Sequence, residues 1–333
     1  MDLTIILVNY KTEALIINCL RSVFKHTKTI AIEIIVADNA YSKEGEALVK
    51  KEFPDIQWID MGYNAGFARA NNAGIDVAKG TFLLLLNADT LLIDNAIEKA
   101  IFRLKQDEGI AAIGGIQLYE DLSEMPYYKT INDIRSTFYI LPNKPIFYKI
   151  LAFCLPKPHF TDPNETNSLV GAFVLTRAVT VAKVGKLEED FFMYGEDVEW
   201  AGRLKKAGKL CYFDDIRFIH LVNESPFRRT QISFVNRFST QMQVSNFLWI
   251  RKEFGIGAYL VLILNYLSLI PFFWTWKIFV NLSHFRSPFT ELSNQKIFTR
   301  KTFVLLKYFW RTIRNNPYFY QIKPSENIDK LYQ

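Results

Sequence analysis

Paired cysteines are absent from this chain of 333 residues. Its three cysteines, Cys19, Cys154 and Cys211, are scattered, with no spacing that indicates a disulfide framework or a cysteine-based zinc site. This usage is typical of a protein in a reducing compartment. The N-terminus also lacks the basic region and long apolar run of a signal peptide, and residues 3–8 instead predict a β-strand.

Acidic residues are scarce in the last quarter of the chain. Residues 251–333 contain 12 Lys and Arg against 4 Asp and Glu, a net charge of +8, whereas the whole chain carries +6. A basic, aromatic-rich tail of this kind binds either nucleic acid or an anionic membrane surface. Because the tail has no recognisable nucleic-acid-binding motif, we expect no nucleic-acid partner.

Short apolar runs alternate with helical patterns along the first part of the chain. The apolar fraction is 50% and aromatic residues make up 15%, enough to fill a large core. Apolar runs predict strands at 3–8, 32–37, 56–59, 81–86 and 111–114, and helical patterns occupy 12–25, 45–52, 66–78 and 94–106. This alternation predicts an α/β fold with a mostly parallel sheet covered by helices on both faces.

Polar residues follow three of the predicted strands. Asn9, Asp38 and the pair Asn87 and Asp89 come directly after apolar runs. Each of them alone is typical of a turn or a helix cap. Because ligands bind outside the carboxyl ends of parallel strands, the three positions together indicate a shared ligand site.

Residues 191–200 join an apolar run to a cluster of acids. The run ends at Gly195, and the acids Glu196, Asp197 and Glu199 follow at once. A carboxylate beside apolar surface has a raised proton affinity, which suits a general base. The alternative interpretation is the acidic first turn of a helix, which the helix dipole favours.

Six short motifs then occur in one order. They are Val8-Asn9-Tyr10, Ala37-Asp38-Asn39-Ala40, the segment from Asn64 to Gly74, Leu86-Asn87-Ala88-Asp89, Gly171-Ala172-Phe173 and the acidic block. Each motif alone is weak, but the ordered set over about residues 3–222 resembles the inverting glycosyltransferases of family 2. The resemblance is to the rhamnosyltransferase-like branch that builds bacterial surface polysaccharides. It implies a GT-A (Rossmann-like) fold.

The resemblance implies a nucleotide-sugar donor, with a dTDP- or UDP-sugar expected. The residues expected to bind it are Val8, Asn9, Tyr10, Asp38, Asn64, Gly66, Arg69, Asn71, Asn87, Ala88 and Asp89. Asp38 would accept hydrogen bonds from the base or ribose, and Gly66 would allow close backbone approach at a helix N-terminus that favours phosphate.

Asn87-Ala88-Asp89 occupies the place of the family's metal-binding Asp-x-Asp motif. A divalent cation, Mg²⁺ or Mn²⁺, offsets the charge of the leaving diphosphate in such enzymes. Since Asn87 brings no charge, Asp89 is left as the secure metal ligand of this motif. His220 is expected to complete metal or phosphate binding, although a lone histidine is as often structural.

The catalytic residues implied by the resemblance are Asp197 as the base and Glu196 as its acceptor-positioning neighbour. Gly171 and Ala172 would leave room for the acceptor. Glu199 and Arg203 are four residues apart, a spacing that also suits a simple ion pair on a helix face.

We expect a catalytic domain at 1–225 and a helical, basic segment at 226–333. Residues 118–168 interrupt the strand and helix alternation and are interpreted as an insertion, either an acceptor-side loop or an ordinary surface excursion.

Residues 256–276 contain no charged side chain and are long enough to span a bilayer. Three arrangements are compatible with this stretch: a transmembrane helix, an interfacial hairpin bent at Pro271, or a helical pair buried in a soluble protein. The basic flanks favour a cytoplasmic enzyme resting on the inner leaflet, peripheral or monotopic, which also suits a glycan or polyprenyl-linked acceptor.

The expected function is inverting transfer of a sugar, with rhamnose as one candidate, in surface polysaccharide synthesis. One rival, a sugar nucleotidyltransferase, is expected to carry a glycine-rich loop after the first strand, whereas residues 8–12 contain no glycine. The other rival is a non-catalytic membrane scaffold that keeps the fold. The sequence does not predict an oligomeric state.

Overall fold

Contacts between residues divide the chain into two units in the computed structural model, which describes residues 1–221 and 234–329. Unit 1 contains Met1–Ile131, Pro158–Phe192 and 196–221, and unit 2 contains Asn132–Lys157, Met193–Gly195 and 234–329. The predicted boundary at 225/226 lies outside the described residues. The predicted insertion at 118–168 is divided between the units, because its central part packs with the C-terminal helices.

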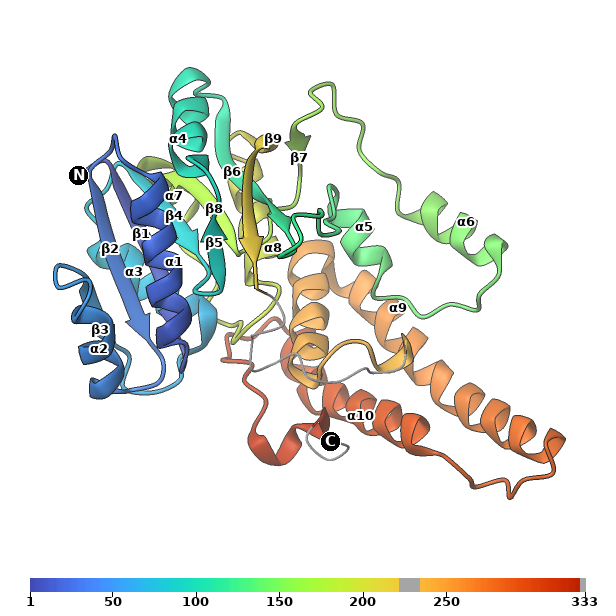
Figure 1. The fold of residues 1–333 in the computed structure, drawn as a ribbon. Coiled ribbons are helices and arrows are strands. Elements are labelled where there is room, and N and C mark those ends of the chain that lie inside the picture. The colour runs from blue at the N-terminus through green and yellow to red at the C-terminus, as the bar shows by residue number, and fades with distance from the viewer. Residues whose placement is uncertain (222–233, 330–333) are drawn as a thin grey trace. The chain divides into compact units, whose positions relative to one another are not determined.

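Unit 1 is built on one sheet flanked by helices (Figure 1). The strands are β1 (Leu3–Asn9), β2 (Ile32–Asp38), β3 (Gln57–Asp60), β4 (Phe82–Leu86), β5 (Thr90–Leu92), β6 (Ile110–Leu118), β7 (Glu165–Thr166), β8 (Phe173–Arg177) and β9 (Lys209–His220). The helices are α1 (Glu13–His26), α2 (Lys43–Lys50), α3 (Gly66–Val77), α4 (Ala96–Gln106), α7 (Ala178–Val184) and α8 (Glu196–Lys205). The strand order is β3-β2-β1-β4-β8-β6-β9-β5, and β7 pairs with β9.

The predicted α/β fold is confirmed, but the sheet is mixed and not mostly parallel, with β6 and β9 forming a further parallel pair outside its N-terminal half. Strands β3, β2, β1 and β4 are parallel to one another, whereas β8 is antiparallel to both β4 and β6. The chain between β6 and β8 leaves and re-enters the sheet at the same edge, so β8 must run in the opposite direction. Apolar runs predict strands but carry no information on direction.

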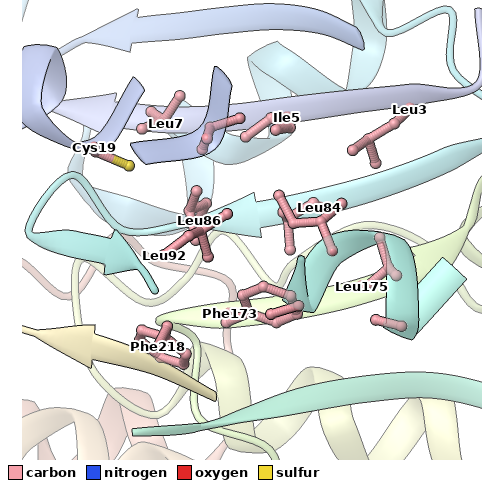
Figure 2. Packing of buried hydrophobic residues seen from close by; sticks show 14 of the residues in the cluster. Leu3, Ile5, Leu7, Cys19, Leu84, Leu86, Leu92, Phe173, Leu175 and Phe218 are labelled. Carbon is pink, nitrogen blue, oxygen red and sulfur yellow. The ribbon is translucent and has the colours of Figure 1, made fainter. Parts of the chain in front are cut away.

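The two faces of the sheet are covered by different helices. Leu3, Ile5 and Leu7 of β1 pack into one cluster with side chains of α1 and α4, while Ile6 packs into a second cluster with α3, α7 and α8. Figure 2 shows the first cluster, in which Leu84 and Phe173 of neighbouring strands lie on the same face. Successive residues of a strand point to opposite faces, which explains why these continuous apolar runs are buried on both sides.

Unit 2 is helical and aromatic. Its helices are α5 (Ile131–Ser136), α6 (Pro145–Cys154), α9 (Thr240–Ser283) and α10 (Ser293–Ile313), with short 3₁₀ turns at Phe234–Asn236 and Pro324–Glu326. Edge-to-face pairs hold its interior, for example Phe138 with Trp249 at 5.7 Å between ring centroids and Phe247 with Tyr266 at 5.0 Å. Such geometries add to the stabilisation from buried area.

Helix α9 contains the predicted membrane segment, and the predicted hairpin at Pro271 is wrong. Pro271 lies inside the helix, and the only non-helical residue within α9 is Gly255, whose φ of +82° is in the left-handed region that glycine tolerates. Residues C-terminal to Gly255 pack against α10, where Trp274 donates to Thr299 Oγ1 at 3.0 Å. Among the described residues, α9 is the one helix long and apolar enough to cross a membrane by length and composition.

All three cysteines are free, and two of them are buried. Burial raises the pKa of Cys19 from 9.0 to about 12, and burial likewise raises the pKa of Cys211 to about 12. Because the thiolate is the reactive form, we predict that one thiol, Cys154, reacts with a maleimide at pH 8 in the native protein and that three react in denaturant. Rapid reaction of two or three thiols in native buffer would contradict the packing of unit 1.

Candidate active site

The topology brings the predicted strand-end residues to one edge of the sheet. Asn9 at the end of β1 is in register with Asp38 at the end of β2, and β1 is also parallel to β4, which leads into residues 87–89. β8 is antiparallel to β4, so Gly171 and Ala172 enter at this same edge. The carboxyl ends of β6 and β9 lie there too, because these strands are parallel to each other and antiparallel to β8.

Asn9 and Asp38 form a buried pair that shapes the first two loops. Asn9 Nδ2 donates to Asp38 Oδ1 at 2.9 Å, and Asn9 Oδ1 accepts from Thr12 N at 3.0 Å. Asp38 also accepts from the backbone amides of Ala40 and Ser42, at 2.8 and 3.2 Å. Their flanking residues Val8 and Tyr10 are half-buried. The pair therefore holds the loops, while the carboxylate oxygens keep capacity for further hydrogen bonds.

Gly66 lies against the acidic block, which the sequence did not predict. Its φ is +78°, and a Cβ at this position would overlap the carbonyl oxygen of Phe192. Phe67 N donates to that carbonyl at 2.8 Å, and Asn64 Oδ1 accepts from Gly66 N at 3.2 Å. We expected the backbone at Gly66 to be approached closely by a phosphate, but in the structure it is the carbonyl of Phe192 that lies against it.

Asn71 and Arg69 differ in how they present their side chains. Asn71 is 1% exposed and donates to Phe67 O at 3.0 Å, so it bonds within α3. This geometry does not support the predicted nucleotide contact of Asn71. Arg69 keeps a partly exposed side chain, with its Nε 3.7 Å from Glu189 Oε2. The neighbouring Asn72 ties α3 to Leu187, which precedes the acidic block.

The loop at residues 87–89 is held by Ala172, in the turn that leads into β8. Asn87 N donates to Ala172 O at 3.0 Å, and Thr90 Oγ1 donates to Asn87 O at 2.8 Å. Ala88 is 8% exposed, while Asn87 and Asp89 remain partly accessible. The loop is thereby fixed in front of β4 with its polar side chains at the edge.

Asp89 and His220, the two predicted metal ligands, are in contact. His220 Nε2 is 3.1 Å from Asp89 Oδ1, and His220 Nδ1 is 2.6 Å from Gln117 Oε1. In the tautomer whose Nδ1–H donates to Gln117, Nε2 is an acceptor beside a carboxylate, an arrangement suited to a cation. Gln117 was missed at the sequence level, although a polar residue near the end of the apolar strand β6 obeys the same rule as Asn9 and Asp38.

These residues fit a divalent cation only in part. Across residues 1–221 and 234–329, no cluster of three or more His, Cys, Asp or Glu side chains that could hold a metal ion is present. A carboxylate and an imidazole nitrogen are ordinary ligands of divalent metals. The pair therefore offers two protein ligands and leaves other positions for oxygens of a bound substrate.

Asp197 contacts Gly171 of the predicted acceptor-side motif. Gly171 N donates to Asp197 Oδ2 at 3.0 Å, and a Cβ on Gly171 would come within 3.2 Å of Asp197 Cβ. Gly171 therefore lets the carboxylate approach the backbone amide. Behind it, burial raises the pKa of Tyr212, with the Asp197 charge adding to the rise, and Tyr212 Oη accepts from Val170 N at 3.0 Å.

The other two acids of the block are placed differently. Glu196 is 3% exposed at the start of α8, whereas Asp197 is partly accessible. Glu199 and Arg203 form the predicted ion pair at 2.7 Å, which confirms the structural interpretation of Glu199. Among the three acids, Asp197 thus combines accessibility with contact to the Gly171 motif.

The segment just before these acids has an unusual backbone. Tyr194 and Gly195 have φ values of +70° and +87°. Within unit 2, the buried Ser245 Oγ of α9 donates to Met193 O at 2.7 Å. A non-glycine residue in the left-handed region is strained and persists only where its surroundings fix it. Packing against α9 fixes the turn from which α8 begins.

Comparisons with known proteins agree with this fold. Residues 4–163 match the family Glycosyl transferase family 2. The chain is 28% identical over 254 residues to the low-salt glycan biosynthesis hexosyltransferase Agl10 of Haloferax volcanii, covering 71% of this chain and 74% of that protein. It is 26% identical over 173 residues to the poly-beta-1,6-N-acetyl-D-glucosamine synthase of Staphylococcus aureus, covering 52% of this chain and 38% of the synthase.

Two solved structures share the fold. One is the mannosyltransferase PcManGT from Pyrobaculum calidifontis in complex with GDP-Man and Mn²⁺, with a TM-score of 0.51, 14% identity and coverage of 93% of this chain and 87% of that one. The other is GalNAc-T7 with UDP, GalNAc and Mn²⁺, with a TM-score of 0.50, 16% identity and coverage of 66% and 44%.

The fold, a GT-A-like α/β sheet with its polar edge, and these matches define a glycosyltransferase. Residues 4–163 are similar to the glycosyltransferases of family 2, and the chain is a glycosyltransferase. The two rivals, a sugar nucleotidyltransferase and a non-catalytic scaffold, are set aside by this assignment.

Gly66 offers a direct test of the contact between α3 and the acidic block. We predict that Gly66→Ala lowers the free energy of unfolding by about 2–4 kcal/mol, since it adds left-handed strain and a clash with Phe192. Gly62 is the matched control: its φ is +70°, and no described atom lies within 4 Å of an added Cβ. Gly62→Ala should cost only the strain, about 1 kcal/mol. Urea melts of both variants measure the difference, and equal costs would contradict the contact.

Proposed function

We propose that the enzyme transfers a hexose from a nucleotide diphosphate sugar to a hydroxyl group of a glycan acceptor, with inversion at the anomeric carbon. The observation that carries this proposal is the hydrogen bond from Gly171 N to Asp197 Oδ2 at the edge that also holds Asp89 and His220. A single displacement needs a base on the acceptor side of the anomeric carbon, here Asp197, and groups that bind the diphosphate on its other side, here Asp89 and His220. Glycan synthesis is named for Agl10 and for the S. aureus synthase, which supports a glycan acceptor here.

Asp197 is the proposed general base. Its carboxylate takes the proton of the acceptor hydroxyl as that oxygen attacks the anomeric carbon, while the bond between the anomeric carbon and the diphosphate oxygen breaks. The proton ends on Asp197, and the electron pair of the broken bond leaves with the diphosphate. Gly171 N–H keeps the carboxylate in place, and no covalent intermediate is required.

The buried Glu196 is a positioning residue in this proposal. With 3% of its surface exposed, it holds the start of α8 rather than contacting a bulky acceptor. Gly171 has no side chain and Ala172 a small one, so they would leave room for the acceptor, as the sequence resemblance implied.

Asp89 and His220 would hold the divalent cation, Mg²⁺ or Mn²⁺, together with diphosphate oxygens. When bound, such a cation offsets the negative charge that develops on the leaving diphosphate. The two solved structures that share the fold contain Mn²⁺, which supports this assignment. Gln117 fixes the imidazole plane through Nδ1.

Donor binding is proposed along the edge from β2 to α3. Asp38, which is 1% exposed and accepts from Asn9 and two backbone amides, would hold the loop that meets the base or ribose. Arg69 with Asn64 would lie toward the phosphates, with Val8, Tyr10 and Asn87 alongside. GDP-Man and UDP are the nucleotides named for the solved structures, so UDP-, dTDP- and GDP-sugars, including dTDP-rhamnose, form the donor set to test.

We also propose that unit 2 docks on the inner face of the cell membrane, which brings a lipid-linked acceptor to a cytoplasmic enzyme. On α9, aromatic and aliphatic side chains remain exposed, including Phe272 at 51%, Trp276 at 58% and Phe279 at 62%. The basic residues of α10 supply attraction to anionic lipids.

Asp197→Asn tests the base. We expect the variant to lose about 10³-fold in kcat, because an amide cannot accept the proton, while the donor dissociation constant changes little. Glu199→Gln is the control, since Glu199 pairs with Arg203 and takes no part in the proposed step. Product formation with a radiolabelled donor measures the rate, and turnover within tenfold of wild type in Asp197→Asn would refute the assignment.

The donor and cation are tested by thermal shift. A true donor at about 100 times its dissociation constant should add about 2.7 kcal/mol to the free energy of unfolding. We expect this stabilisation to be larger with Mn²⁺ or Mg²⁺ than with EDTA, and the difference to vanish in Asp89→Asn. Asp76→Asn, which alters an exposed pair with Lys186, should keep the difference. Equal cation dependence in both variants would remove Asp89 from the cation site.

A further inference from the structure

Helix α6 (Pro145–Cys154) has the composition of a core helix but none of its ten residues is buried within the described part of the chain. Phe153 is 87% exposed, Ile146 58% and Ile150 54%. Its only charged residue is Lys149. A helix that is apolar on nearly all sides is normally buried in protein or in lipid. Figure 1 shows α6 carried on two extended connections.

The apolar face of α6 points away from the protein. Ile146, Ile150 and Phe153 have the i, i+4, i+7 spacing of one helical stripe. The opposite side carries the half-buried Leu151 and leads to Leu155, which is 6% exposed and anchors the end of the helix. In an ordinary surface helix the larger apolar stripe faces the protein interior, whereas in α6 it faces outward.

The charge around α6 selects the partner. No Asp or Glu occurs between Asp133 and Asp162, and Lys144 and Lys149 lie just before and within α6. Two further bases of this interval have partners, because Lys157 pairs with Asp133 at 2.6 Å and Arg135 lies over the ring of Phe254. A second copy of the chain would bring these like charges together. An anionic bilayer complements them, because lysine side chains reach the headgroups while apolar and aromatic groups enter the acyl boundary.

We propose that α6 is a membrane-docking helix that inserts its Ile146–Ile150–Phe153 face into an anionic phospholipid surface. The inference extends the membrane docking proposed for α9 to a second segment, separated from it in sequence and exposed on its own. It rests on the proposed membrane location but not on the glycosyl-transfer step. Docking through two segments would fix the orientation of unit 2 on the bilayer, where a single segment would leave it free to rotate.

The test compares the full chain with Ile150→Gln/Phe153→Gln in co-sedimentation with vesicles of phosphatidylglycerol and phosphatidylcholine. We expect the partition coefficient of the double variant to fall about tenfold or more, since two apolar side chains leave the interface. Leu48→Gln/Phe102→Gln is the matched control on helices of unit 1. Leu48 is 52% exposed and Phe102 58%, and this double variant should bind vesicles as the wild type does. Vesicles of phosphatidylcholine alone should bind the wild type weakly.

A second measurement does not need a variant. Cys154 lies at the exposed end of α6, and the other two cysteines are buried, so an environment-sensitive fluorophore can be attached there. We expect a blue shift of its emission on anionic vesicles. Unchanged emission together with wild-type partition of the double variant would overturn the proposal. So would a change from dimer to monomer in the double variant without loss of vesicle binding, because the face would then join two copies.

Donor-induced thermal stabilisation separates this proposal from the enzymatic one. The α6 double variant should keep the full donor shift, because no donor-binding residue is altered. A double variant that loses vesicle binding but keeps the donor shift supports α6 docking alone. Failure of every donor to stabilise the wild type would refute the proposed function while leaving α6 docking to its own test.

Discussion

The hydrogen bond from Gly171 N to Asp197 Oδ2, at 3.0 Å, is the interaction on which the proposed site depends. Gly171 and Ala172 precede β8, and the carbonyl of Ala172 holds the loop of Asn87 and Asp89. One short segment thus connects the proposed base to the proposed cation pair. Any side chain larger than hydrogen at Gly171 would press on Asp197, since an added Cβ would lie 3.2 Å from Asp197 Cβ.

A second contact fixes the same block from the opposite side. The carbonyl of Phe192 accepts from Phe67 N at the start of α3, and Gly66 makes room for it. The residues between these anchors, Met193 to Gly195, have their contacts in unit 2, where Ser245 holds Met193. The turn before Asp197 is held in a left-handed conformation by packing, which is the usual reason that such strain persists near a functional site.

The charge pattern agrees with the different tasks proposed for the two units. Unit 1 collects carboxylates and amides at one sheet edge, where Asn9, Asp38 and Asp89 are held in place by backbone donors or by each other. Unit 2 exposes apolar and aromatic groups among basic residues on α6, α9 and α10. This division suits an enzyme that binds a soluble, anionic donor in one unit and a membrane surface with the other.

Much of this could be predicted from the sequence, because local patterns determine local structure. Apolar runs of four to six residues predicted β1 to β4 near their observed bounds and part of β6, and polar residues after three of them indicated the ligand edge. The order of motifs predicted a shared site for Asp197 and Asp89, and the structure shows His220 in contact with Asp89. The rest required tertiary structure. The direction of β8, the contact of Gly66 with Phe192, the burial of Glu196 beside an accessible Asp197 and the part played by Gln117 all depend on residues far apart in the chain. No local pattern encodes such contacts, since they arise only when the sheet brings its strand ends together.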